Sequence, residues 1–271
     1  MNRPTPGPFH AARNGPQPGP RTGATRAAEV RCAVCGTTSR QSRFRPMPPE
    51  GAPDLDLRPG EPLRSTMAAW LQQCPHCGYV APEIAHAHPA AIEAVGTAPF
   101  RALIADTTHP PLSRRFLAYA YVLEETGALH AAAEATLQAA WAADDARKPD
   151  LARAWRGDAV ALWRAGPPLD AEQTIRVVDA LRRAEAFDDA GATADQLAAS
   201  HPPDAVAGVV ALEQRLIALE DSGRHTVASA LPPPSRRPHA SHGSIARRSP
   251  RPGPGPGASL WDRIRRLFRR G

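Results

Sequence analysis

The sequence contains only four cysteines, a single lysine and few aromatic residues, and these shortages restrict its function class. Aromatic side chains make up 5% of the chain, so no clear surface for stacking bases is predicted. No run of about 18 apolar residues occurs, which excludes a membrane-spanning helix. The sequence has no apolar signal segment near residue 1, and no nucleophile motif, phosphate-binding loop or His-Glu-x-x-His motif. We therefore expect a cytoplasmic protein that is not an enzyme and has no small-molecule substrate.

Charge is distributed unevenly along the chain. The formal net charge is +6, but residues 232–271 hold ten arginines against one acid and carry +9. Residues 1–31 carry +4, which leaves −7 for residues 32–231. An acidic central part argues against a nucleic-acid surface on its helices. Because Lys148 is the only lysine, we interpret the abundance of arginine as a compositional bias.

Proline and glycine concentrate towards the two ends of the chain. Residues 1–28 and 229–257 are rich in both and show no apolar periodicity. Such segments bury too little apolar surface to offset the entropy lost on ordering. The sequence therefore predicts a disordered tail over residues 1–28 and a disordered linker over residues 229–257.

All four cysteines belong to two copies of the motif Cys-x-x-Cys-Gly. Two intervening residues let both sulfur atoms of a pair face one tetrahedral metal, and glycine adopts the left-handed backbone of such a turn. Two of these turns supply four thiolates, a closed coordination shell that suits Zn²⁺. The sequence predicts a structural zinc ribbon over residues 29–87, with ligands Cys32, Cys35, Cys74 and Cys77.

The two cysteine pairs are separated by an unusually long insert of 38 residues. Its first half is rich in proline and glycine and is predicted to be an irregular loop. Residues 67–73 are predicted to form a strand that enters the second cysteine turn.

Three alternatives for the ribbon stay open. Rubredoxins, which bind iron, also pair Cys-x-x-Cys-Gly with Cys-Pro-x-Cys-Gly. The motif Cys74-Pro-His-Cys77 also occurs in thiol oxidases of the DsbA type, where a helix N-terminus lowers the pKa of the first thiol. That interpretation needs a thioredoxin-like βαβ setting and leaves the first cysteine pair unused. A third alternative is a nucleic-acid-binding regulator that uses arginines near the metal, a partner that the composition disfavours.

From His88 onward, apolar residues recur at helical spacing. We predict helices over residues 89–105, 111–126, 129–146, 150–165, 170–186, 188–199 and 204–222. The short breaks between them predict antiparallel hairpins, with Trp141, Trp155 and Trp163 in the core. Two of the turns look like those of tetratricopeptide (TPR) repeats, although their offset of 58 residues is not a multiple of the period of about 34. The predicted fold is mostly α: a small N-terminal β zinc ribbon followed by a TPR-like antiparallel helical-hairpin domain over residues 88–228.

This combination resembles a bacterial family of unknown function whose members join a ribbon containing Cys-Pro-x-Cys to TPR-like helices. The resemblance rests on Cys32, Cys35, Cys74-Pro-His-Cys77-Gly78-Tyr79 and residues 148–156, and it covers about residues 30–225. It implies an architecture and carries no implication for an activity.

Other polar residues are interpreted as structural. His76, His86 and His88 lie near the cysteines and are not predicted to bind the metal. The adjacent acidic pairs at residues 124–125, 144–145 and 188–189 are predicted to be solvated helix ends, because neighbouring residues on a helix point about 100° apart.

Residues 258–271 are predicted to form a basic amphipathic helix that begins with a capping pair, Ser259 and Asp262. Its apolar residues fall within an arc of about 120°, and arginines take the flanks and the far side. The predicted contact residues are Leu260, Trp261, Arg263, Ile264, Arg265, Arg266, Leu267, Phe268, Arg269 and Arg270. This pattern is typical of a helix that lies in an anionic membrane surface. Docking onto the acidic body or onto a partner protein, and disorder, are the alternatives.

The sequence thus predicts a non-enzymatic adaptor with structural Zn²⁺, a protein partner and a peripheral position at the inner membrane face. A rubredoxin-like or thiol redox protein, and a nucleic-acid-binding regulator, are the alternative functions.

Overall fold

The computed structural model describes residues 26–45 and 47–230. The predicted helix over residues 258–271, with all its predicted contact residues, lies outside the described residues, as do most of the two proline-rich segments. Statements about structure below refer to the described residues.

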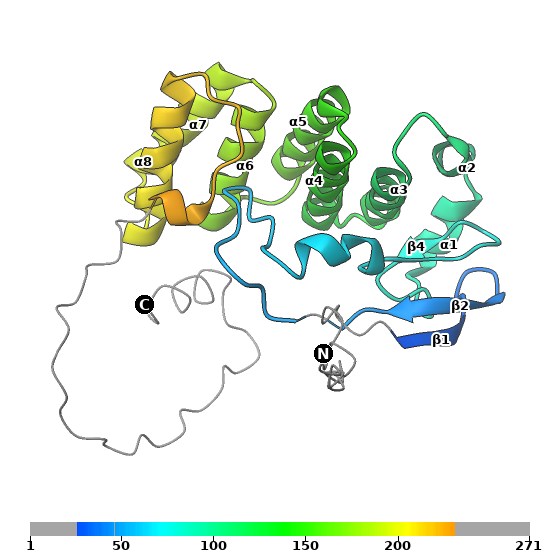
Figure 1. Cartoon of the computed structure of the whole chain (residues 1–271). Coiled ribbons are helices and arrows are strands. Elements are labelled where there is room, and N and C mark those ends of the chain that lie inside the picture. Colours follow the sequence, from blue (N-terminus) through cyan, green and yellow to red (C-terminus); the bar gives the residue numbers. More distant parts are fainter. Residues whose placement is uncertain (1–25, 46, 231–271) are drawn as a thin grey trace, which may run out of the picture.

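The ribbon consists of two small antiparallel hairpins (Figure 1). β1 (Arg26–Arg31) pairs with β2 (Thr38–Arg43), and the first Cys-x-x-Cys-Gly turn connects them. β3 (Gln72–Gln73) pairs with β4 (Val80–Ala81) around the second turn. The four cysteines therefore lie at the turns of two hairpins.

A 3₁₀ helix (η1, Arg64–Ala69) includes residues 67–69, the first three residues of the segment 67–73 for which the sequence predicts a strand. Met67 points into the core from this helix. Arg115 donates hydrogen bonds to the backbone carbonyls of Ala68 (3.1 Å) and Leu71. Because these carbonyls bind a side chain, they cannot join a ladder, and the strand is limited to Gln72–Gln73.

Helices account for most of the rest of the described chain, as predicted. They are α1 (Pro89–Gly96), α2 (Ala98–Ala105), α3 (Pro111–Glu125), α4 (Leu129–Asp145), α5 (Pro149–Ala165), α6 (Ala171–Arg183), α7 (Phe187–Ala199) and α8 (Asp204–Ala218), followed by the 3₁₀ helix η2 (Val227–Ala230).

The one predicted helix that divides in two is 89–105. Thr97 is extended, ends α1 and caps α2 by accepting a hydrogen bond from the backbone N–H of Phe100 at 3.3 Å. A side-chain cap of this kind starts a new helix where the chain changes direction.

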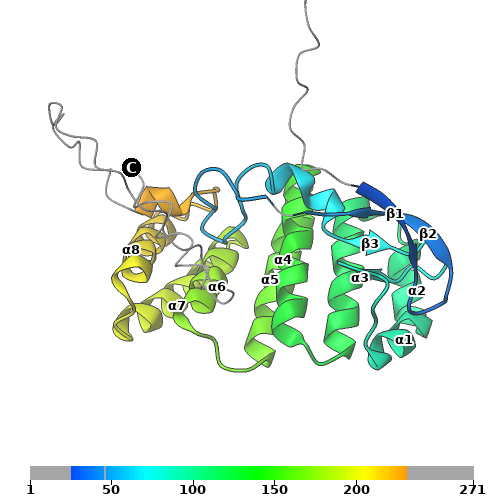
Figure 2. The ribbon, with the colours of Figure 1, turned by 90° about the horizontal axis from the view of Figure 1, so that it is seen from below.

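From α3 to α8 the helices pack side by side as successive hairpins, with the ribbon against α1–α3 at one end and α8 at the other (Figures 1 and 2). One core cluster runs from Val30 in the ribbon to Ala190 in α7 and includes the three tryptophans predicted to be buried, Trp141, Trp155 and Trp163. A second cluster joins α6, α7 and α8.

The insert between the cysteine pairs runs from the ribbon along the helices as far as α8 (Figures 1 and 2). The backbone N–H of Leu55 donates to the carbonyl of His225 (3.0 Å), and the N–H of Val227 donates to that of Pro53 (2.9 Å). Leu55 is 1% exposed and packs among the side chains of α6–α8. The insert is irregular, as predicted, but its middle is part of the core.

Asp56 of the insert is a buried carboxylate held by the ends of two helices. It accepts hydrogen bonds from Trp141 Nε1 of α4 at 2.7 Å and from Arg183 Nη1 of α6 at 2.9 Å. The backbone N–H of Arg58 donates to its other oxygen at 3.2 Å. Burial by itself would raise the pKa of Asp56, but Arg183 and Arg156 hold it below its usual value.

The acidic pair at the end of α4 contacts buried arginines, which corrects the prediction that it is only a solvated helix end. Asp144 accepts hydrogen bonds from Arg156 (2.5 Å) and Arg183 (2.8 Å). Asp145 pairs with Arg58 at 2.5 Å, and the guanidinium of Arg58 lies 5.9 Å from the ring centroid of Trp141. Three arginines therefore balance three aspartates where the insert crosses the ends of α4 and α6.

Replacing Asp56 by asparagine tests this contact. Asp56→Asn leaves Arg183 with the partly exposed Asp144 as its remaining counter-charge, so we expect the free energy of unfolding to fall by about 3 kcal/mol in urea titrations. Asp188, which is exposed at the start of α7, supplies the matched control, and Asp188→Asn is expected to change it by less than about 1 kcal/mol. Equal effects of the two substitutions would contradict the structural role of Asp56.

A second buried charge cluster joins α6 to α8. Arg182 donates to Glu213 at 2.7 Å, to Asp179 at 2.5 Å and to the carbonyl of Gly223 at 2.9 Å. All three charged side chains are almost fully buried, and two carboxyl groups share one guanidinium. Burial and the neighbouring Asp179 raise the pKa of Glu213 well above its usual value. Glu213 therefore keeps its proton at pH values at which an exposed glutamate is ionised.

This raised pKa predicts how stability depends on pH. The folded chain holds a proton on Glu213 that the unfolded chain releases above about pH 4.3, so the contribution of this group to stability is present below that pH and is lost as pH rises towards the folded pKa. The substitution Glu213→Gln removes this pH dependence, because a glutamine side chain does not ionise. We expect the urea midpoint of the native chain to fall relative to that of the variant between pH 5 and pH 8. If the urea midpoints of the native chain and of Glu213→Gln changed in parallel between pH 5 and pH 8, Glu213 would already be ionised in the folded chain.

Candidate metal centre

The four cysteine sulfur atoms converge on one point between the two hairpins. All four lie within 4.8 Å of one another, with Cys32 Sγ 3.8 Å from Cys77 Sγ and Cys35 Sγ 3.6 Å from Cys74 Sγ. A tetrahedral site with metal–sulfur bonds of about 2.3 Å has sulfur–sulfur distances of about 3.8 Å. All four thiols are free, so they are available as ligands. The set of donors and its dimensions fit a tetrahedral metal ion.

The two turns repeat the same backbone geometry. In the first, the N–H of Gly36 donates to the carbonyl of Cys32 at 2.9 Å, and in the second the N–H of Gly78 donates to that of Cys74 at 3.0 Å. Gly36 and Gly78 have φ angles of 74° and 78°, in the left-handed region that the sequence predicts for them. This local geometry turns each pair of sulfur atoms to the same side.

The thiols have unlike surroundings. Cys32 and Cys74 are buried, whereas Cys35 and Cys77 are partly exposed. Hydrogen bonds from the side chain and backbone of Thr37 lower the pKa of Cys35 to about 5. Burial raises the pKa of both Cys32 and Cys77, and the neighbouring sulfur atoms raise that of Cys77 further. A divalent cation at the centre of the cluster favours the thiolate form of all four.

The cluster rests directly on the helices. A Cβ atom at Gly78 would lie 3.2 Å from Ile104 Cγ1, so the second turn packs closely on α2. The buried phenol of Tyr79 donates to the carbonyl of His86 at 2.9 Å, and the N–H of Ala33 donates to the carbonyl of Ile84 at 2.8 Å. The segment after the second turn therefore holds both turns against the start of the helical array.

The nearby histidines have other roles, as predicted. His88 Nδ1 accepts a hydrogen bond from the N–H of Ala90 and caps α1, and His86 lies 3.5 Å from the carboxylate of Glu83. His76 is exposed beside Cys35. Within the described residues, the group of side chains with metal-ligating spacing consists of the four cysteines.

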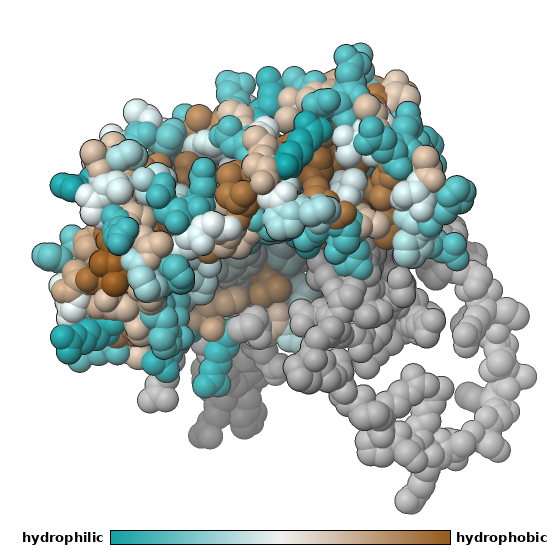
Figure 3. Space-filling model, turned by 180° about the vertical axis from the view of Figure 1, so that it is seen from behind, coloured by the Kyte–Doolittle hydropathy of each residue, from teal (hydrophilic) through white to brown (hydrophobic). Residues whose placement is uncertain are grey.

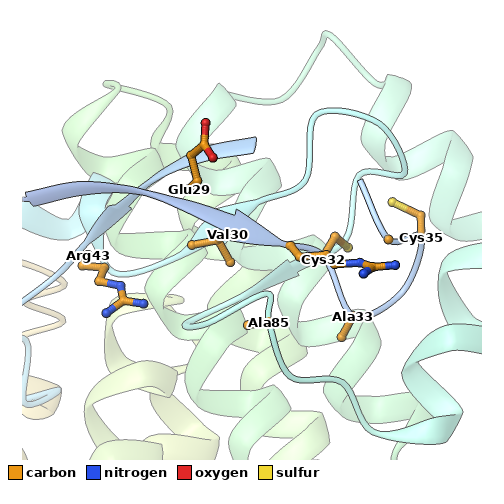
Figure 4. Close-up of a pocket in the computed structure, with 9 residues that line it drawn as sticks. Glu29, Val30, Cys32, Ala33, Cys35, Arg43 and Ala85 are labelled. Carbon is orange, nitrogen blue, oxygen red and sulfur yellow. The ribbon is translucent and has the colours of Figure 1, made fainter. Parts of the chain in front are cut away.

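An open hollow of about 630 Å³ lies beside the first turn (Figure 4). β1, the first cysteine pair and Arg43 of β2 contribute to its lining. Arg31 folds over the turn, with Nη2 3.5 Å from the position that a Cβ atom would take at Gly36. Four thiolates around a divalent ion carry a net charge of −2, and this guanidinium partly offsets it.

All four predicted metal ligands thus come together, whereas the ten predicted contact residues of 258–271 lie outside the described residues.

The sequence did not identify the role of Arg115, whose contacts to the backbone of residues 68–71 hold the insert next to the second cysteine pair. An arginine on a predicted helix gives no indication, from its neighbours in the sequence, that it will bind the backbone of a distant segment.

Comparison with known proteins yields no match to a family model, to a curated protein or to a solved structure. The resemblance to the bacterial family described above therefore stays a prediction. What the structure does show is a ribbon-like cysteine cluster followed by helical hairpins.

Substitution of one ligand and of its neighbour tests the centre. Cys74→Ser removes a buried sulfur donor, so we expect bound metal to fall from about one equivalent to below about a tenth, as measured by elemental analysis of the purified full chain. His76→Ala, two residues away, is expected to keep its metal. If His76→Ala lost its metal and Cys74→Ser kept it, the assignment of the cysteines as ligands would be wrong.

Proposed function

We propose that the protein is a non-enzymatic adaptor built around a structural zinc centre. The observation that carries this proposal is the closed set of four sulfur donors. With all four tetrahedral positions filled by the chain, no position remains for a substrate or a water molecule. The ion would act by holding the two hairpins together, and it would contribute on the order of 10 kcal/mol to the folded state.

The setting of the cysteines supports a metal rather than a thiol oxidase. In thiol oxidases, a helix N-terminus lowers the pKa of the first thiol. Here, the turn that contains Cys74 leads into the two-residue strand β4, and the next helix begins only at Pro89. Zinc suits four thiolates and needs no redox partner. A rubredoxin-like iron site is the alternative, and it would give the purified protein a visible colour.

The helical array supports binding of a protein partner through a surface of mixed polarity. Large apolar side chains that are exposed on the described surface are few: Met47, Ile92 and Leu219. Figure 3 shows apolar side chains on the back of the molecule in small groups among polar ones. Interfaces of reversible complexes are about as apolar as ordinary protein surface. We therefore propose a reversible rather than an obligate partner.

The last residues supply the proposed membrane contact. Among the described residues, no helix is long and apolar enough to cross a bilayer. The proposed contact of residues 258–271 is peripheral, because this segment is shorter than the roughly 20 apolar residues that a spanning helix needs. The pattern of five apolar residues and five arginines over 260–270 fits an interfacial helix on anionic lipid at the cytoplasmic side.

Membrane binding is tested by cosedimentation with vesicles that contain phosphatidylglycerol. We expect the full chain to sediment and a chain that ends at Gly257 to stay in solution, with equal metal content. A third chain, with Ile264, Leu267 and Phe268 changed to serine, keeps every arginine but loses the apolar face, and we expect it to bind at least about tenfold more weakly. Equal binding by the full and shortened chains would overturn the tether and direct the search to a protein complex.

A further inference from the structure

The arginines of the β1–β2 hairpin differ from those of the helical array in having no partners. In the described structure, Arg31, Arg40, Arg43 and Arg45 are exposed and form no ion pair or side-chain hydrogen bond. We call these four residues the basic hairpin. From Arg58 to Arg183, by contrast, every arginine except Arg147 donates to a carboxylate or a backbone carbonyl. Among the described residues, three further arginines have no such partner, Arg147, Arg215 and Arg224, and they lie apart from one another on the acidic body. The basic hairpin is therefore the place where free guanidinium groups follow one another closely in the chain.

The charge of the described chain is separated in the same way. Residues 26–45 contain five arginines and one acid, Glu29, a net charge of +4. Residues 46–230 contain 25 acidic and 15 basic residues, a net charge of −10. A polyanion would therefore be repelled by the helical array and attracted to the hairpin.

The single acid does not neutralise the hairpin. Glu29 lies opposite Arg40 in the strand register, so these two side chains share one face of the hairpin, although no ion pair joins them. Figure 4 shows Glu29 pointing away from Arg43, which lies on the other face. Arg31 lies over the first cysteine turn and partly offsets the thiolates. Arg43 and Arg45, which have no acid opposite them in the register, remain free to contact an external anion.

An aromatic ring lies among these arginines. Phe44 directly follows β2, between Arg43 and Arg45, and is partly exposed. Its ring centroid is 6.3 Å from that of Trp70, whose ring contacts Phe116 of α3 edge to face. The ring of Phe44 therefore packs on Trp70, which itself packs on the core residue Phe116. A supported aromatic ring flanked by arginines is the arrangement on which single-stranded nucleic acids stack their bases.

We propose that the basic hairpin and Phe44 bind single-stranded nucleic acid, a function beyond the adaptor role and independent of it. Arg43 and Arg45, which flank Phe44 in the chain, contact phosphates on either side of the base on which Phe44 stacks. Arg40, on the other face of the hairpin, adds to the positive potential. The aromatic ring favours a single strand over a duplex, whose bases are already stacked. A lipid surface fits less well, because the outward-facing neighbours on the hairpin, Ala27, Thr38 and Ser42, offer little apolar area to insert.

The test is fluorescence anisotropy of the full, metal-loaded chain with a labelled single-stranded 20-nucleotide DNA of mixed sequence. Changing Arg40, Arg43 and Arg45 together to alanine is expected to weaken binding about tenfold at 0.1 M salt and to make the slope of log K against log salt shallower by about 2. The matched control changes Arg147, Arg215 and Arg224, which are exposed and without hydrogen-bonded partners on the acidic body, to alanine. We expect this control variant to bind the oligonucleotide with an affinity within about twofold of that of the unaltered chain.

Two further variants separate charge from stacking. Replacement of the three hairpin arginines by lysine keeps the charge and is expected to restore most of the binding. Phe44→Leu keeps an apolar contact with Trp70 but removes the aromatic face, so single-strand binding is expected to weaken about fivefold while duplex binding changes little. Metal content, measured for every variant, shows that the ribbon stays folded.

The arginines outside the described residues are the same in all variants, so they contribute equally to each titration. Equal affinities of the hairpin and control triple variants for the oligonucleotide would overturn the proposal. Loss of binding to phosphatidylglycerol vesicles, with oligonucleotide binding unchanged, would overturn it in favour of a lipid contact. Neither result would bear on the tether, which is tested by shortening the chain.

Discussion

Convergence of the four sulfur atoms is the constraint on which the rest of the structure depends. Cys35 and Cys74 are 39 positions apart in the chain, yet their sulfur atoms lie 3.6 Å apart. Both ends of the insert are therefore held at one place, and its middle must leave the ribbon and return. It does so along the helices, where Leu55 reaches α8 and Asp56 reaches α4 and α6. Ribbon, insert and helices thus form one packed unit.

Buried charges make this packing specific. Many core positions of α4 are alanine, which lets helices approach closely but offers little shape to distinguish one arrangement from another. Asp56 and Glu213 are buried in the arrangement in which arginines of α6 reach them. A shifted insert would bury Asp56 away from its arginine, which is strongly unfavourable. A displaced α8 would remove from Arg182 the hydrogen bond that it donates to Glu213. These contacts hold the insert to α4 and α6, and α8 to α6.

The distribution of charge separates the proposed interactions in space. Along the sequence, the acidic helices lie between the basic hairpin and the arginine-rich residues 232–271. Acidic helices repel polyanions, and the arginines of the array that already pair with carboxylates contribute little positive potential to attract them. The shared core adds to this division, because it packs the ribbon, and with it the basic hairpin, against α1–α3. Two anionic partners could then be bound by different parts of one chain.

The sequence by itself determined the two cysteine turns, their left-handed glycines and most helix positions, because these depend on residues a few positions apart. It also placed the three tryptophans in the core from their helical spacing. Only the tertiary structure decided the path of the insert, the 3₁₀ helix at Arg64–Ala69 and the buried partners of Asp56. The contact between Asp56 and Arg183 joins residues 127 positions apart, and each of them alone looks like an ordinary surface charge. Local spacing carries no information on such pairs, since they form only when separate elements pack together.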